Sequence, residues 1–253
     1  MSQSLPLISL PMHAHENQEF KDFDPYNDPE GALRRFNQVA NNVRSLKDGA
    51  RKRLLLDSLK DATPLLMEFV KDQAEACVLY GDIETTELIK SGTPIEDMEI
   101  SVASLLFVED SGKSMMLSFW SSGSALGAPL DFFLHALDHA KKLVFYNSNF
   151  DLKVASSGDR QLISRWWRKT HDPYYILREE FGFDVVLKLD RLLKDNGIAP
   201  KTASGVQAVK MYKSGDYQAL QEYNQRDVQA LFELVGLESV SLSNGVRTRL
   251  IHV

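Results

Sequence analysis

The sequence predicts an α/β domain with a mixed sheet, preceded by a helical extension. Three observations favour this fold class: hairpin strands come first, helices and strands then alternate, and the last periodic segment is a long helix. The chain has 253 residues, of which 43% are hydrophobic and 25% charged. Those proportions are typical of a globular protein and exclude collagen-like and disulfide-scaffold classes.

The N-terminal part of the chain divides into two segments. Residues 1–31 carry scattered acids and prolines without sustained periodicity, so we interpret them as a mostly disordered acidic arm. Residues 32–76 have helical spacing and predict a helical extension, in which Pro64 is expected to open the last helix. The basic run at residues 51–53 leaves two interpretations open, a solvated helix face or a surface that contacts phosphate.

Strand patterns begin at residue 77. A short apolar strand is expected over residues 77–80 and is followed by Gly81. Two further strands, 100–108 and 115–120, flank a turn and predict a hairpin.

Helices and strands alternate in the second half of the chain. A helix is expected over residues 130–142, a fourth strand over 143–146 and a helix over 149–155. Residues 160–195 are expected to be mainly helical, with a loop around residues 171–173. The strongest helical pattern covers residues 217–234, with Asp216 as its N-cap and Gly236 as its stop. The α/β domain is therefore expected to span residues 77–237, with a C-terminal tail over 238–253.

The charge and the cysteine content restrict the protein class. Cys77 is the single cysteine, which excludes an internal disulfide and fits an intracellular protein. The formal net charge of −6 divides into −5 over residues 1–31 (six acids, one Lys), +3 over 32–76 (nine basic, six acidic residues) and −4 over 77–253. An apolar run of about 18 residues is absent from the sequence, so no membrane span is expected, and residues 5–12 make a poor signal peptide.

Two acids follow the first strand. If the strand continues through Gly81, the side chains of Asp82 and Glu84 point to the same face, because residues two apart share a face. Burying two neighbouring carboxylates without compensation is costly, and a divalent cation removes that cost. A solvated acidic turn is the alternative interpretation.

Two more acids lie in unusual positions. Asp151 follows the fourth strand, where a helix-start residue favoured by the helix dipole is the alternative. Asp227 lies on or beside the apolar stripe of the last helix, and Tyr223 is one turn earlier on the same face. A buried Asp paired with Arg or a backbone donor is the alternative there. As a set, the oxygen ligands suit Mg²⁺ or Mn²⁺ rather than zinc, and a two-metal site is expected.

Three short motifs resemble those of a known superfamily. Residues 82–85 (Asp-Ile-Glu-Thr), 147–151 (Asn-Ser-Asn-Phe-Asp) and 223–228 (Tyr-Asn-Gln-Arg-Asp-Val) resemble the motifs of the DEDD 3′–5′ exonuclease superfamily. The spacing Tyr-x-x-x-Asp resembles the tyrosine subclass, because the histidine subclass would need His at position 222, which is Glu. Residues 201–205 further resemble the predicted polymerase-B-type exonuclease branch. The resemblance covers about residues 77–236 and implies a ribonuclease H-like fold.

The resemblance also implies roles for individual residues. It assigns the metal ligands, which are Asp82, Glu84, Asp151 and Asp227. It assigns Tyr223 to holding the attacking water, since a phenol with a pKa near 10 is a poor base at neutral pH. Substrate contacts are implied for Asn147, Thr85 and Phe150. The region over residues 159–181 matches the superfamily less clearly, which leaves substrate preference open.

Two further motifs lie in that region. In the basic-aromatic run at residues 165–169, two adjacent tryptophans cannot both face the core, so one is expected to be exposed or to cover a neighbouring element. Ordinary packing and base stacking are the two interpretations. The neighbours His171 and Asp172 are left without a role.

The implied function is a metal-dependent 3′–5′ exonuclease that releases nucleoside 5′-monophosphates. The expected partner is nucleic acid, DNA or RNA, with a single-stranded 3′ end, and no membrane. Two alternatives remain: a catalytically inactive nucleic-acid-binding or scaffold module of the same fold, and an endonuclease of that fold.

Overall fold

A computed structural model describes residues 23–89, 92–121, 128–182, 187–200, 203–242 and 247–248. The first described elements form a pair of packed helices, α2 (Pro29–Ser45) and α3 (Ala50–Ala76). Asp28 caps α2, because its side chain accepts a hydrogen bond from the Gly31 N–H at 3.0 Å. The helical extension therefore begins a few residues before the expected boundary at residue 32. Most of the expected acidic arm, residues 1–22, lies outside the described residues.

Pro64 does not open a separate helix, which corrects the expectation from the sequence. It lies inside the 27 residues of α3. The buried side chains on both sides of the proline, Leu55 and Ala62 before it and Leu66 after it, follow one continuous stripe. Packing of that stripe outweighs the one helical hydrogen bond that a proline removes.

The centre of the molecule is a six-stranded mixed sheet in the order β4-β3-β2-β1-β5-β6. Its strands β1, β2 and β3 are antiparallel, whereas β5 runs parallel to β1. The hairpin of β2 with β3 and the mixed character of the sheet agree with the expectation from the sequence. The bounds of the strands are β1 Cys77–Thr85, β2 Ile100–Glu109, β3 Ser114–Trp120, β4 Ala128–Pro129, β5 Lys142–Val144 and β6 Thr170–His171. The two-residue strands β4 and β6 were not expected; β6 lies where a loop was expected.

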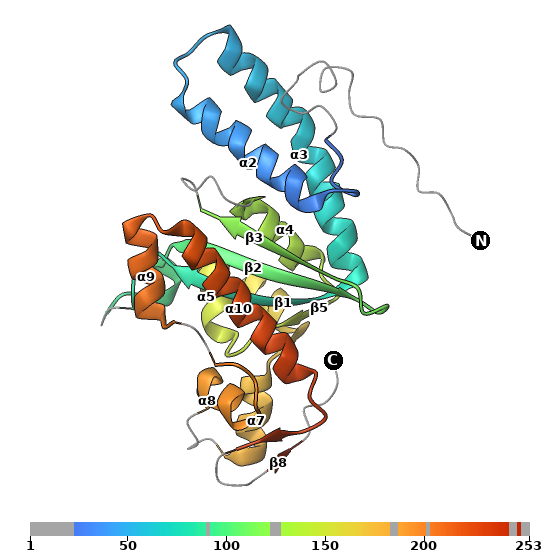
Figure 1. Ribbon diagram of the computed structural model, residues 1–253, viewed down its shortest axis with the longest axis vertical. Helices are drawn as coiled ribbons and strands as arrows, with labels where there is room; N and C mark the ends of the chain where they lie inside the picture. The colour runs from blue at the N-terminus through green and yellow to red at the C-terminus, as the bar shows by residue number, and fades with distance from the viewer. Residues whose placement is uncertain are drawn as a thin grey trace, which may run out of the picture.

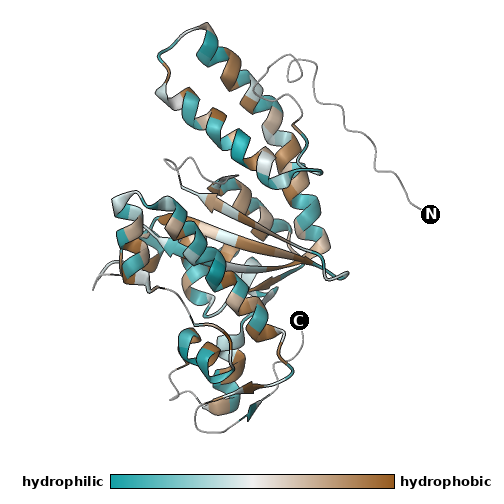
Figure 2. Cartoon of the chain, in the orientation of Figure 1, coloured by the Kyte–Doolittle hydropathy of each residue, from teal (hydrophilic) through white to brown (hydrophobic). Residues whose placement is uncertain are grey.

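Helices cover both faces of this sheet (Figure 1). The helix α10 (Tyr217–Val235) crosses one face over β1 and β2, with α9 (Gly205–Ser214) beside it. The opposite face packs against α3, α4 (Leu130–His139) and α5 (Asn149–Ala155). In Figure 2, hydrophobic colours follow much of β2 and β3, whereas the covering helices carry mixed colours. That distribution is expected when each helix buries one side only.

The remaining elements complete the domain at one end of the sheet. They are a 3₁₀ turn (Ile95–Asp97), α6 (Arg160–Trp167), α7 (Pro173–Phe181), α8 (Leu189–Asp195), β7 (Val240–Ser241) and β8 (Arg247–Thr248). Buried Leu192 and Leu193 of α8 pack in one cluster with Val240 and Leu242. Residues 240 and 242, which we expected in a C-terminal tail, thus belong to the packed structure. Within the described residues, no helix is long and apolar enough to cross a membrane.

Candidate metal centre

The strand β1 supplies two carboxylates to the face under α10. Val78 and Tyr80 pack in a cluster with residues of α10, so the even-numbered side chains of β1 face that helix. Asp82 and Glu84 continue this alternation inside the strand, and both are half-buried. The strand continues past Gly81 through its pairing with β2, and a glycine fits at residue 81 because Phe145 and Leu105 occupy the space where a Cβ would lie. The predicted shared face of Asp82 and Glu84 is confirmed.

The helix α10 supplies the third carboxylate and a tyrosine. Its N-cap Asp216 accepts a hydrogen bond from the Ala219 N–H at 3.4 Å. An apolar stripe that includes Val228 and Leu231 packs the helix on the sheet. Asp227, which is only 1% exposed, and Tyr223, which is 3% exposed, lie one helical turn apart on the buried side. This placement agrees with the helical pattern of the sequence.

Three carboxylates converge at this point. Asp82, Glu84 and Asp227 each offer an oxygen, and these oxygens lie within 4.8 Å of one another. Three carboxylates at such distances repel each other unless a proton or a cation compensates them. An all-oxygen set of this kind fits a hard divalent cation and does not fit a structural zinc site. The residues present therefore fit a divalent metal centre.

Asp151 lies next to this cluster and is held by the strand backbone. The parallel pairing of β5 with β1 ends at Tyr80, so β5 provides no partner for the β1 backbone beyond that residue. Asp151, in the first turn of α5, accepts a hydrogen bond from the Ile83 N–H at 3.2 Å. Burial raises the pKa of Asp151 well above its ordinary value, and the nearby Asp82 carboxylate raises it further. A cation close to both groups would favour their ionised forms.

Tyr223 is placed as a hydrogen-bond donor. Burial raises the pKa of its hydroxyl, and the carboxylates of Glu84 and Asp227 raise it further. The hydroxyl also forms a side-chain hydrogen bond with Asp227. A phenol with such a pKa keeps its proton at neutral pH, so Tyr223 can donate a hydrogen bond but cannot act as a base.

Asn224 links α10 to β1 through a side-chain hydrogen bond, a role that was not predicted from the sequence. Its side-chain Nδ2 donates a hydrogen bond to Asp82 Oδ2 at 2.7 Å, and Asn224 is fully buried. The hydrogen bond orients the Asp82 carboxylate. A polar residue next to Tyr223 on a buried helix face was the signal that could have identified it.

Asp172 holds the loop before Asp151 in place. This role was not predicted from the sequence. Its carboxylate accepts hydrogen bonds from the backbone N–H groups of Asn147 at 2.9 Å, Ser148 at 2.6 Å and Tyr174 at 3.0 Å. Asn147 has a φ of 61°, in the left-handed region that few residues other than glycine adopt. Asp172 therefore holds this unusual loop conformation while capping α7. The Asp-Pro pair at a helix start was the available signal.

The three predicted substrate contacts lie in different environments. Asn147 is exposed at the start of the loop, and Phe150, in the first turn of α5, is half-buried against the core. Thr85 is buried on the strand face opposite to Asp82 and Glu84, and its hydroxyl donates a hydrogen bond to the Glu87 carbonyl at 2.7 Å. Asp82, Glu84, Asp227 and Tyr223 thus lie together, and Asp151 lies beside them. The Thr85 side chain is not part of this group.

The basic-aromatic run divides as expected between core and surface. Trp166 is buried and donates a hydrogen bond from Nε1 to Asp138 Oδ1 at 2.7 Å, so its role is packing. Trp167 is 41% exposed and packs edge-on against Tyr175. In the other basic run, Lys52 pairs with Asp48 at 2.8 Å. Residues 201 and 202, which contribute to the resemblance, lie outside the described residues.

Comparison with known proteins agrees with the fold. A family model described as the RNase_H superfamily matches residues 79–237, which include β1, the whole of the sheet after it and α10. No curated protein matches the chain.

Proposed function

The chain belongs to the RNase_H superfamily, which includes nucleases, and we propose that it is a divalent-metal-dependent 3′–5′ exonuclease. Its products would be nucleoside 5′-monophosphates, released from a single-stranded 3′ end of DNA or RNA. The observation that carries the proposal is the convergence of Asp82, Glu84 and Asp227, with Tyr223 hydrogen-bonded to Asp227. We further propose that residues 77–237 carry the activity and that the helical extension modifies substrate binding.

The proposed ligands are Asp82, Glu84, Asp151 and Asp227, and the proposed ions are Mg²⁺ or Mn²⁺. Two such ions, when bound, stabilise the charge that develops on the attacking and leaving oxygens of a phosphodiester. Asn224 keeps the Asp82 carboxylate in one orientation through the 2.7 Å hydrogen bond. The Ile83 N–H does the same for Asp151.

Tyr223 would hold the attacking water in line with the phosphorus. Its hydroxyl remains protonated, because burial and the neighbouring carboxylates raise its pKa. Because its single O–H is donated to Asp227, the phenol oxygen can accept a hydrogen bond from the attacking water and thereby fix the orientation of that water. This assignment keeps Tyr223 in an orienting role and leaves proton removal to another acceptor.

Asn147, Phe150 and Thr85 are the proposed substrate contacts. Asn147 is exposed and is held in place by Asp172, so it can meet a strand that enters from the surface. Phe150 lies three residues further on, in the first turn of α5. Thr85 ends β1, and contact from this residue would involve its backbone or methyl group, since its hydroxyl is bonded to Glu87.

A nuclease panel tests the proposal. The wild-type protein and the Asp82→Asn and Asp227→Asn variants are incubated with 3′-terminated oligonucleotides and a closed single-stranded circle, with Mg²⁺, Mn²⁺ or EDTA. The proposal expects stepwise shortening from the 3′ end, mononucleotide products, and no cleavage of the circle. Cleavage of the circle would identify an endonuclease. Metal-dependent binding without any cleavage would identify an inactive binding module.

A further inference from the structure

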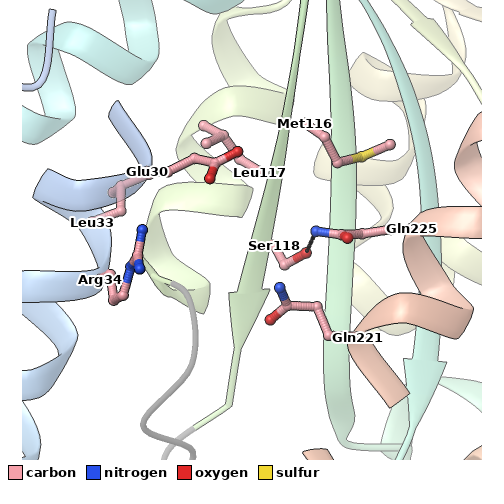
Figure 3. Close-up of a pocket in the computed structure, with 8 residues that line it drawn as sticks. All are labelled: Glu30, Leu33, Arg34, Met116, Leu117, Ser118, Gln221 and Gln225. Atoms are coloured by element: carbon pink, nitrogen blue, oxygen red, sulfur yellow. Dashed lines mark hydrogen bonds between the residues drawn. The ribbon is translucent and has the colours of Figure 1, made fainter. Parts of the chain in front are cut away.

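A polar cavity of about 340 Å³ lies between the helical extension and the edge of the sheet. Figure 3 shows that α2 contributes Glu30 and Arg34 on one side, that β3 contributes Ser118, and that α10 contributes Gln221 and Gln225 on the other side. None of these side chains belongs to the carboxylate cluster. The size is that of a site for one small-molecule group.

The two glutamine side chains present different groups to a ligand. Gln221 accepts a hydrogen bond from Trp120 Nε1 at 3.2 Å through Oε1, so its NH₂ group is the part available to donate. Gln225 donates from Nε2 to Ser118 Oγ at 2.9 Å, so its carbonyl oxygen is the part available to accept. The two residues are one helical turn apart. The wall on α10 therefore offers one donor and one acceptor in neighbouring positions.

A row of polar side chains connects this cavity to the metal centre. Asp82 pairs with Ser104 across β1 and β2, and Ser104 pairs with Ser118 across β2 and β3. The Ser104 and Ser118 hydroxyls are hydrogen-bonded at 2.9 Å. Neighbouring strands lie about 4.8 Å apart, which places the Ser118 wall about 10 Å from Asp82.

The chemistry of the walls fits a nucleotide. Nucleobase edges carry donors and acceptors next to each other, which matches the pair from Gln221 and Gln225. Arg34 is exposed at the rim and offers a guanidinium, the group best suited to a phosphate. Glu30, one turn before Arg34, can accept a hydrogen bond from a sugar hydroxyl or an amino group. Base, sugar and phosphate would thus each meet a complementary group.

We propose that this cavity is a second nucleotide subsite, which holds a nucleotide of the bound strand on the 5′ side of the phosphodiester at the metal centre. The base lies against Gln221 and Gln225, and the phosphate lies against Arg34. The inference rests on the proposed function, because it assumes a nucleic-acid strand at the metal centre. It gives the helical extension a direct part in substrate binding.

Oligonucleotide length tests the subsite. Binding of a 5′-labelled dinucleotide and a 5′-labelled octanucleotide to the full chain is measured by anisotropy, with Ca²⁺ in place of Mg²⁺. The variants are Arg34→Gln and Gln221→Glu. Gln221→Glu keeps a side-chain oxygen that can accept the hydrogen bond from Trp120 Nε1. Lys141→Gln, at an exposed position between α4 and β5, is the control because all three substitutions lower the net charge by one.

The subsite predicts that each cavity variant weakens octanucleotide binding about tenfold, equivalent to ~1.4 kcal/mol. Dinucleotide binding should be unchanged in all variants, and Lys141→Gln should bind both ligands like the wild type. Equal effects on both lengths, or wild-type octanucleotide binding by folded Arg34→Gln, would overturn the subsite. A melting curve for each variant identifies a folding defect, and the exposed Arg34 position provides a test if Gln221→Glu does not fold.

Cleavage assays separate this inference from the proposed function. If the wild type cleaves the octanucleotide but the cavity variants bind it normally, the subsite is wrong and the function stands. If the variants lose octanucleotide binding while no cleavage occurs with Mg²⁺ or Mn²⁺, the subsite stands and the exonuclease proposal is wrong. Failure of the wild type to bind the octanucleotide overturns both.

Discussion

Asn224 on α10 and Asp82 on β1 are 142 positions apart and share a 2.7 Å hydrogen bond. The Asn224 side chain is fully buried and Asp82 is half-buried, and the bond between them fixes the helix against the strand. Tyr223 and Asp227, on either side of Asn224 in the sequence, are positioned by the same contact. The geometry of the carboxylate cluster thus depends on a neutral amide as well as on acids.

The carboxylates at the cluster should be essential for cleavage but not for folding. Asp82→Asn and Asp227→Asn are each expected to lower the single-turnover rate by about 10²–10³-fold, since each removes a negative charge that would hold the divalent cations needed at the transition state. The metal-free variants should melt at the wild-type temperature or above it, because repulsion between carboxylates falls. Asp131→Asn, at an exposed position on α4, serves as the control. Wild-type cleavage by a folded double variant would refute the site assignment.

The Tyr223 hydroxyl should contribute to the rate and not to binding. Tyr223→Phe keeps the ring and its packing, so cleavage at saturating Mg²⁺ is expected to fall by about 10²-fold, the lower end for acid–base or water-orienting groups. Oligonucleotide affinity, measured in Ca²⁺, should change little. Tyr212→Phe on α9 is the matched control. An unaltered cleavage rate in Tyr223→Phe would mean that the ring only packs against the sheet.

Asp172 should contribute more to the free energy of unfolding than an ordinary helix cap does. Asp172→Ala removes the acceptor for three backbone N–H groups and is expected to lower the free energy of unfolding by about 1–3 kcal/mol. Asp172→Asn keeps one acceptor oxygen and should have a smaller effect. Denaturant titration measures both. Because the Asn147 conformation depends on these bonds, Asn147→Gly, which adopts a positive φ readily, should partly restore stability to Asp172→Ala.

The stability of the metal-free protein should fall as the pH rises. Burial and Asp82 raise the pKa of Asp151 in the folded state above its ordinary value of about 3.9. The folded state therefore binds more protons than the unfolded state, and its stability decreases from about pH 4 upward through the raised pKa.

Denaturant titrations in EDTA between about pH 4 and pH 8 measure this decrease. Asp151→Asn, whose side-chain oxygen can still accept the Ile83 N–H, should flatten the profile. Saturating Mn²⁺ should flatten it in the wild type as well, because a cation favours the ionised carboxylate. An identical slope in Asp151→Asn and wild type would exclude Asp151 as the titrating group.

The sequence predicted the α/β class, the mixed sheet and the shared face of Asp82 and Glu84, because period-two and helical patterns report which face of an element is buried. It also predicted the buried position of Asp227. It did not identify Asn224 or Asp172 as positioning residues, because the partners that give them this role, Asp82 for Asn224 and residues 147–148 for Asp172, lie far away in the sequence. The continuous α3 through Pro64 depends on packing against other helices, which a local proline rule does not include.

The distance along the chain between β1 and α10 has a consequence for biosynthesis. The first two carboxylates are synthesised more than 140 residues before Asp227, and contacts of such long range form late in folding. A nascent chain that ends before α10 has the hairpin strands but lacks Tyr223, Asn224 and Asp227. Such a chain cannot complete the cluster while it is still close to the RNAs of the translating ribosome. The order of the elements therefore delays assembly of the centre until α10 has been made.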